Sequence, residues 1–219
     1  MDFVGFKETV LTVFPELTAE QWDRFAALDA LYRDWNAKIN VISRKDIDGL
    51  YLHHVLHSLA IAAYLKTEKP DEYAALPGRK VQDVGTGGGF PGIPLAILWP
   101  DVSFTLCDSV GKKTLVASEV SKALALGNVQ VVNARAESLP ETYDYIVSRA
   151  VASLDDFYPW VKGKFSRAIL YLRGGDVAEE TARLMGRFRL RAGSVGTWRI
   201  DRWLEDAYFD GKYVIDIRK

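Results

Sequence analysis

Apolar residues in the first part of the chain recur at the spacing of an α-helix. The expected buried face of residues 18–37 carries Trp22, Phe25, Leu28, Tyr32 and Trp35. Thr18 and Gln21, three positions apart, match the pattern of a capping box. This pair predicts that the helix begins at Thr18.

A second helix is predicted at about residues 46–65, opened by Asp46. The next residues, 66–78, contain two prolines and several charges, which is typical of a joint between structural units. We therefore expect an N-terminal helical extension over residues 1–78 and a second unit over residues 79–219, packed together as one compact molecule.

From Lys80 onward, short apolar runs alternate with helical patterns. The runs that predict strands are 81–84, 104–107, 129–132, 145–147 and 168–172. The stretches that predict helices are 91–99, 112–126, 153–161 and 176–187. Strands that are apolar throughout and alternate with helices indicate an α/β, doubly wound, Rossmann-like fold with a mostly parallel sheet covered on both faces.

The C-terminal tail has a different pattern. Residues 188–191 alternate apolar and basic side chains near the expected sixth strand. Asp210-Gly211 directly precedes the apolar run 212–217, as a hairpin turn precedes a strand. An antiparallel pair at the edge of the sheet is therefore expected.

Composition narrows the class of protein. The content of 48% hydrophobic and 26% charged residues is ordinary for a globular domain. We expect a cytoplasmic protein without a signal peptide, membrane span or disulfide, because the N-terminus lacks a leader pattern, no long apolar run occurs and Cys107 is the only cysteine.

Charge is unevenly distributed along the chain. Residues 1–159 contain 15 Lys and Arg against 21 Asp and Glu, whereas residues 160–219 contain 13 against 8. The basic part is either a set of solvated faces or a surface for a polyanion such as nucleic acid.

The stretch VQDVGTGGGFPGIPLAI at residues 81–97 brings four glycines to the end of the first strand. A dinucleotide-binding fingerprint would need a glycine where Phe90 stands, and a phosphate-binding P-loop would need Lys-Ser or Lys-Thr after the turn. Neither phosphate motif is complete. What remains is the pattern D-x-G-x-G-x-G, formed by Asp83, Gly85, Gly87 and Gly89.

Three alternate glycines let a backbone pass close beneath a ligand, because no Cβ atoms intervene. An acid such as Asp83 suits a cationic ligand better than a pyrophosphate. Asp108, at the end of the second strand, can accept hydrogen bonds from ribose hydroxyls, and Ala136-Glu137 after the third strand can border an adenine. S-adenosylmethionine combines these features.

Five further motifs extend the pattern beyond the glycine turn. They are TLCDSVGKK at residues 105–113, ARAESL at 134–139, IVSRAVASL at 146–154, WNAKINVIS at 35–43 and HHVLHSL at 53–59. Together with Gly-Phe-Pro-Gly at residues 89–92, they closely resemble the RsmG family, also called glucose-inhibited division protein B. The resemblance spans nearly the whole chain.

The resemblance implies a bacterial 16S rRNA guanine-N7 methyltransferase, built on the seven-stranded class I methyltransferase sheet with an N-terminal helical extension. It implies cofactor contacts by Gly85, Phe90, Ala136, Glu137 and Arg149. The substrate would be 16S rRNA or a precursor of the small ribosomal subunit. A small-molecule methyltransferase and an RNA-binding protein without turnover are the alternatives.

The chain departs from the family pattern at two positions. His57 stands where the family usually has an acid, and Arg173 stands where it usually has Lys. Arg173 keeps the charge but not the shape of the side chain. It is therefore open whether His57 and Arg173 have the roles that the family's residues have at these positions.

Methylation at guanine N7 requires no general base, because N7 carries a lone pair and no proton. The residues must instead align the reacting atoms, and Phe90 and Arg149 are the candidates for positioning. The histidines His53, His54 and His57 could in principle bind a metal, but no third ligand type is evident and no metal is expected.

Candidate RNA contacts are the basic residues Lys112, Lys113, Arg173, Arg189 and Arg191. Each of these side chains is either solvated charge or a phosphate contact. We expect a monomer with no membrane contact.

Overall fold

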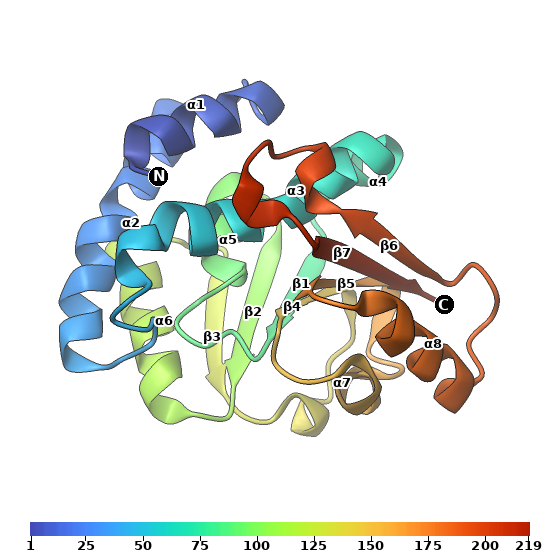
Figure 1. Cartoon of the computed structure of the whole chain (residues 1–219). Helices are drawn as coiled ribbons and strands as arrows, with labels where there is room; N and C mark the ends of the chain where they lie inside the picture. Colours follow the sequence, from blue (N-terminus) through green and yellow to red (C-terminus); the bar gives the residue numbers. More distant parts are fainter.

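The seven strands of the protein form a single mixed sheet in the order β3-β2-β1-β4-β5-β7-β6. The computed structural model describes residues 1–219 (Figure 1). The strands are β1 Lys80–Val84, β2 Ser103–Asp108, β3 Val129–Asn133, β4 Tyr143–Arg149, β5 Phe165–Gly174, β6 Val195–Arg199 and β7 Lys212–Arg218. The predicted α/β fold with a mostly parallel sheet is confirmed.

Strands β1 to β5 are parallel to one another, and β7 runs antiparallel to both β5 and β6. The predicted antiparallel pair at the edge is therefore present, and its reversed strand, β7, lies one place in from the edge. Asp210-Gly211 directly precedes β7, but the connection from β6 is longer than a hairpin turn. It contains two short helices, η4 Ile200–Arg202 and η5 Ala207–Phe209.

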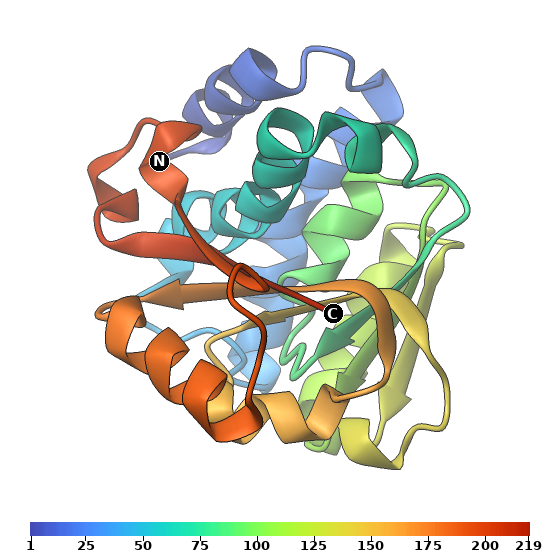
Figure 2. The ribbon, with the colours of Figure 1, turned by 90° about the vertical axis from the view of Figure 1, so that its right-hand side faces the viewer.

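Helices cover both faces of the sheet (Figure 2). The first layer contains α1 Phe3–Val13, α2 Ala19–Lys38, α3 His57–Glu68, α4 Pro70–Ala74, α5 Gly92–Leu98 and α6 Gly111–Ala123. The second contains η3 Ala136–Ser138, α7 Leu154–Val161 and α8 Val177–Phe188. None of these helices combines the length and apolarity that crossing a membrane would take.

The N-terminal helices share a hydrophobic core with the sheet. Phe6, Phe25 and Tyr32 belong to the same cluster of 44 buried residues as Ile93 and Leu106. A second cluster of 15 buried residues lies under α7 and α8 on the opposite face. Burial of these aromatic side chains in the shared cluster fixes the N-terminal helices against the sheet and α5.

Helix α2 begins as predicted, because Thr18 and Gln21 form a complete capping box. The predicted helix at 46–65 is wrong in detail. It consists of η1 Ile47–Gly49, a π-helical segment η2 Leu50–Leu56, and α3. Asp46 makes no capping hydrogen bond, because its carboxylate contacts His53 and His54 instead.

Two other local expectations need correction. The predicted joint at 66–78 is largely helical, since α3 continues to Glu68 and Pro70 occupies the first turn of α4, where proline is tolerated. The alternating residues 188–191 do not belong to a strand. Arg189 ends α8 in the left-handed conformation, with φ of 52°, and β6 starts only at Val195.

Gln21 also connects α2 to the sheet unit. Its side-chain nitrogen donates to the carbonyl oxygens of Ile97 and Leu98 at the end of α5, both at 3.0 Å. We predict that Gln21→Leu lowers the free energy of unfolding by about 1–3 kcal/mol, because buried carbonyls lose their partner. Urea unfolding measures this, and a loss no larger than that of the exposed neighbour variant Glu20→Gln would contradict it.

Candidate functional site

The glycine turn between β1 and α5 has a backbone shape that requires glycine. Gly85, Gly87 and Gly89 have φ values of 70°, 57° and 114°. The amides of Gly85 and Thr86 both donate to the carbonyl oxygen of Cys107, at 2.8 and 3.1 Å. The turn is thereby attached to the end of the neighbouring strand β2.

The three alternate glycines meet different surroundings. A Cβ at Gly85 would lie 2.3 Å from Val151, and one at Gly89 would lie 2.4 Å from Ile93. A Cβ at Gly87 would meet no protein atom within 4 Å. Gly85 and Gly89 are therefore required by packing within the protein, and only Gly87 faces open space.

Asp83 supports the turn from beneath. Its carboxylate is fully buried, and Oδ2 accepts hydrogen bonds from the Thr86 hydroxyl at 2.6 Å and the Gly92 amide at 2.8 Å. Burial raises the pKa of Asp83 to about 7, against the opposing effect of these two hydrogen bonds. A side chain at Gly92 would collide with this carboxylate, since a Cβ would lie 2.7 Å from it.

Asp108 holds the turn from the side. One carboxylate oxygen accepts the Gly87 amide at 3.0 Å, and the other accepts the Val110 amide at 2.9 Å. The side chain also lines a cavity. Each carboxylate oxygen has a second lone pair, so Asp108 can still accept hydrogen bonds from a ligand.

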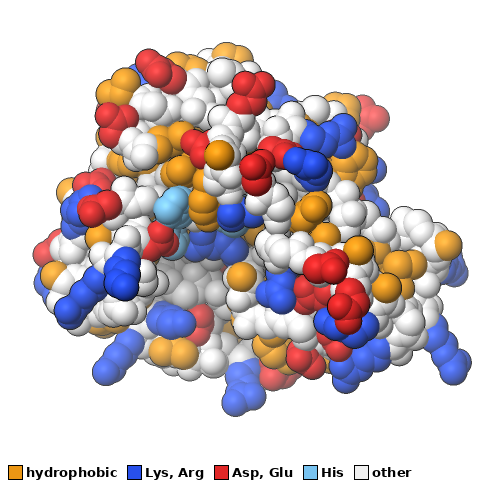
Figure 3. Space-filling view, in the orientation of Figure 1, with side chains coloured by type: hydrophobic (Ala, Val, Ile, Leu, Met, Phe, Trp, Pro, Cys, Tyr) orange, Lys and Arg blue, Asp and Glu red, His pale blue; other side chains and the backbone are white.

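A cavity of about 470 Å³ lies at the carboxyl ends of β1, β2, β3 and β4. Its wall consists of Val84, Gly85, Cys107, Asp108, Ser109, Lys113, Ala134, Arg135, Ala136, Glu137, Arg149, Ala150, Val151 and Trp160. Figure 3 shows a hollow on the face seen in Figure 1, with a histidine and several Lys or Arg side chains around it. Open α/β sheets bind ligands at this end of their strands.

Five predicted cofactor contacts meet in the cavity wall: Gly85, Asp108, Ala136, Glu137 and Arg149. The other predicted contacts are not part of it: Asp83, Gly87, Gly89 and Phe90. Asp83 and Phe90 are buried beneath the turn.

Arg149 lies against Phe90, with its guanidinium carbon 5.5 Å from the ring centroid. Phe90 in turn packs on Tyr32, with ring centroids 4.8 Å apart. Burial lowers the pKa of Arg149 from its ordinary value. Of the two positioning candidates, Arg149 therefore reaches the cavity and Phe90 supports it from behind.

Several wall residues are not evident from the sequence. Arg135 directly precedes Ala136, but nothing in its motif marks it as a wall residue. Trp160 comes from α7 and Val151 from the loop after β4, where Ala150 has a φ of 48°. Lys164 holds the wall from outside, since its ammonium donates to the carbonyls of Ala136, Glu137 and Leu139.

The structure separates the predicted RNA contacts into groups. Lys112 and Lys113 are exposed in the first turn of α6, and Lys113 also lines the cavity. Arg173 pairs at 2.9 Å with Glu180, a residue only 4% exposed, and Glu180 also accepts the Leu154 amide. Arg173 thus holds the loop after β4.

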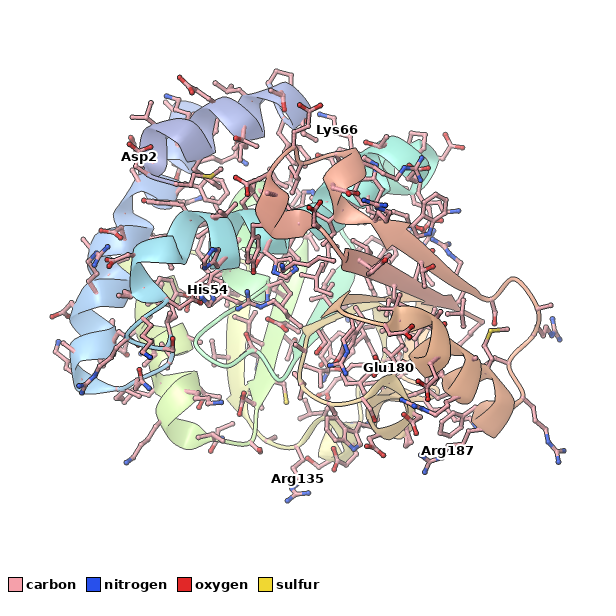
Figure 4. All side chains as sticks on the ribbon, in the orientation of Figure 1. Asp2, His54, Lys66, Arg135, Glu180 and Arg187 are labelled. Atoms are coloured by element: carbon pink, nitrogen blue, oxygen red, sulfur yellow. The ribbon has the colours of Figure 1, made fainter.

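Arg189 and Arg191 are exposed beyond the end of α8. Figure 4 shows Arg187, in the last turn of α8, far from His54 and pointing away from the site. Neither Arg189 nor Arg191 lines the cavity.

The histidines lie beside Arg149 rather than around a metal. The Arg149 guanidinium donates to the carbonyl oxygen of His53 at 2.7 Å and contacts Nδ1 of His54 at 2.8 Å. His57 is buried and contacts the hydroxyl of Tyr208 at 3.2 Å, and burial lowers its pKa well below the ordinary value. No cluster of three or more His, Cys, Asp or Glu is arranged to hold a metal ion.

The fold matches those of solved methyltransferases. Magnesium protoporphyrin IX methyltransferase from Synechocystis aligns with a TM-score of 0.59 at 14% identity, over 93% of this chain and 99% of that one. The Thermus thermophilus 16S rRNA N2 G1207 methyltransferase aligns with a TM-score of 0.54 at 18% identity, over 74% of this chain and 43% of that one. The strand order and the loop site define the protein as having the class I methyltransferase fold.

Sequence comparison narrows the class. The chain belongs to the GidB family, rRNA small subunit methyltransferase G, whose family model matches residues 21–195. Ribosomal RNA small subunit methyltransferase G of Christiangramia forsetii is 52% identical over 79% of this chain and 82% of its own length. The protein of the same name from Flavobacterium psychrophilum is 46% identical over 96% of this chain and 97% of its own.

Gly87 offers a test of ligand contact at the turn. We predict that Gly87→Ala weakens binding of S-adenosylmethionine at least about tenfold, because the new methyl group projects from the turn into the space beside the ligand. Gly193→Ala is the matched control, since Gly193 has a φ of 82° and also faces open space, but belongs to the turn before β6 and does not line the cavity. Calorimetric titration compares the two, and equal affinities would contradict a ligand contact at Gly87.

Proposed function

We propose that this protein transfers a methyl group from S-adenosylmethionine to N7 of a guanine in small-subunit (16S) ribosomal RNA. The strongest support is that Asp108, Glu137 and Arg149 line one cavity beside the glycine turn. These three residues lie at or just after the carboxyl ends of three strands. Membership of the rRNA small subunit methyltransferase G family supplies the class of substrate.

The wall residues fit the cofactor. A volume of about 470 Å³ is within the range of small-molecule sites. The free lone pairs of Asp108 face the cavity and suit ribose hydroxyls, while the backbone of Ala136 and Glu137 suits an adenine edge. Direct contact between Asp83 and the cofactor stays a prediction, since in this structure its carboxylate binds Thr86 and Gly92.

S-adenosylmethionine, when bound, supplies a methyl group that is already strongly electrophilic. Because N7 has no proton to remove, no residue has to act as a base. The protein's residues need only hold the guanine so that N7 is aligned with the methyl group. Arg149 is the wall residue suited to this task, because its guanidinium has hydrogen-bond donors beyond the two used by His53 and His54.

The surface around the cavity suits RNA phosphates. Arg44, Lys45, Lys112 and Lys113 are exposed, whereas Arg33 and Lys38 on α2 are held by aspartates. Val41, three residues before Arg44, packs on Gly88 of the glycine turn, and Lys113 lines the cavity. Exposed cations on these segments can hold the strand that carries the target guanine. That the enzyme acts in the cytoplasm and as a monomer stays a prediction from the sequence.

The test of this function is methyl transfer to small-subunit rRNA purified from a strain that lacks the enzyme. We expect one methyl group per RNA, mapped to N7 of a single guanine. The assay should use both naked rRNA and assembled small subunits. Absence of transfer to either, or methylation at another base or atom, would reject the proposal.

We predict that Arg44→Glu/Lys45→Glu weakens RNA binding and reduces its salt dependence by about 0.7 in slope for each phosphate that is no longer neutralised. Cofactor binding should stay unchanged, because neither residue lines the cavity. Arg189→Glu/Arg191→Glu makes the same change of charge at the far end of α8 and should leave both properties near wild type. RNA titrations at several salt concentrations compare the two variants. A larger loss of RNA affinity in Arg189→Glu/Arg191→Glu would contradict the prediction and indicate that RNA binds near the end of α8.

A further inference from the structure

A chain of polar contacts joins the loop before η1, the π-helical segment η2 and strand β4. Arg149 contacts the His54 ring at Nδ1, and the opposite ring nitrogen, Nε2, contacts the carboxylate of Asp46. His54 is 12% exposed and lies in the middle of the site face in Figure 4. Short π-helical segments frequently occur at functional sites.

The chemistry of the three groups fixes the position of the protons. A guanidinium can only donate hydrogen bonds, so Nδ1 of His54 must accept from Arg149. The ring proton then sits on Nε2 and is donated to Asp46. Burial, and next the charge of Arg149, lower the pKa of His54 to about 4, so the ring is neutral at physiological pH.

The charged and titratable groups around this ring come from three elements. Asp46 faces it from the preceding loop, Arg149 from β4, and His53 and His57 from its own helical stretch. Protonation of Nδ1 would place an N–H donor against the N–H donors of Arg149. The neutral ring is therefore the form that can hold the guanidinium.

Arg149 is enclosed on the sides that do not face the cavity. The ring of Phe90 lies behind the guanidinium. Nη1 donates a hydrogen bond to the His53 carbonyl oxygen, and Nη2 donates one to Nδ1 of His54. Arg149 also lines the cavity, and its guanidinium has further N–H groups beyond the two that these contacts use. A displacement of the guanidinium would therefore change what the cavity presents to its ligands.

We propose that His54 and Asp46 are positioning residues for methyl transfer, which act by orienting Arg149 toward the reacting groups. This rests on the proposed function, in which Arg149 holds the substrate or the cofactor. The physical requirement is a hydrogen-bond acceptor at the place of Nδ1, held in that tautomer by a carboxylate on the other side of the ring.

The experiment measures kcat, KM for RNA and cofactor affinity for four variants beside wild type. His54→Leu removes the acceptor, and His54→Asn keeps a side-chain oxygen near the position of Nδ1. Asp46→Asn weakens the bond that fixes the tautomer. His53→Leu is the matched control, because the His53 side chain also contacts Asp46 and lies in η2, but only its backbone contacts Arg149.

We expect kcat to fall about 10- to 100-fold in His54→Leu and less in Asp46→Asn, with KM for RNA little changed, because a misplaced group near the reaction slows the chemical step. His54→Asn should recover part of kcat, and His53→Leu should lose no more kcat than Asp46→Asn, because the His53 side chain reaches Arg149 only through Asp46. Wild-type kcat in His54→Leu, or an equal loss in His53→Leu, would overturn the proposal.

A double-mutant cycle separates this role from a structural one. If His54 acts only through Arg149, adding His54→Leu to Arg149→Ala causes no further loss of kcat. Independent losses that multiply would overturn the proposal. The histidine side-chain nitrogen shifts in NMR report the tautomer of folded wild type directly, and a proton on Nδ1 would also overturn it. Inactive wild type on every RNA tested would instead reject the proposed function.

Discussion

Two carboxylates at the ends of adjacent parallel strands hold the glycine turn, and the rest of the site is built on that turn. Backbone hydrogen bonds pair the amides of Gly85, Thr86, Gly89 and Phe90, and the two carboxylates bind groups on either side of them. Asp83 binds Thr86 and Gly92 from below, while Asp108 binds Gly87 and the start of the next loop. These hydrogen bonds offset part of the cost of burying Asp83, and the turn acquires one fixed shape.

The N-terminal helices complete this site rather than merely preceding it. The Tyr32 hydroxyl donates to the Gly88 carbonyl at 2.8 Å, and Val41 packs on the same glycine. The helical segment of residues 47–68 brings His54 to Arg149. The cavity wall comes from the sheet and the segments that follow it, whereas His53 and His54, which contact Arg149, come from η2, so the two parts of the chain must pack correctly for this arrangement to form.

Charge counted along the sequence differs from charge available at the surface. The basic excess of residues 160–219 is largely used within the fold, in the ion pairs of Arg173, Arg183, Arg187, Arg199, Arg202 and Arg218. The basic residues that line the cavity, Lys113, Arg135 and Arg149, all come from the acidic part of the chain. Electrostatic attraction of RNA depends on unpaired charge and its position, which a segment total does not give.

The sequence by itself determined every strand except β6, most helices, the glycine turn and the family, because apolar periodicity and glycine spacing are local properties of the chain. It also placed Asp108, Glu137 and Arg149 at one site, since the carboxyl ends of parallel strands meet at one edge. Only the tertiary structure decided that Asp46 contacts histidines instead of capping a helix, and that Arg173 pairs with Glu180. Those partners are chosen by burial and by contacts between distant segments, for which no local pattern exists.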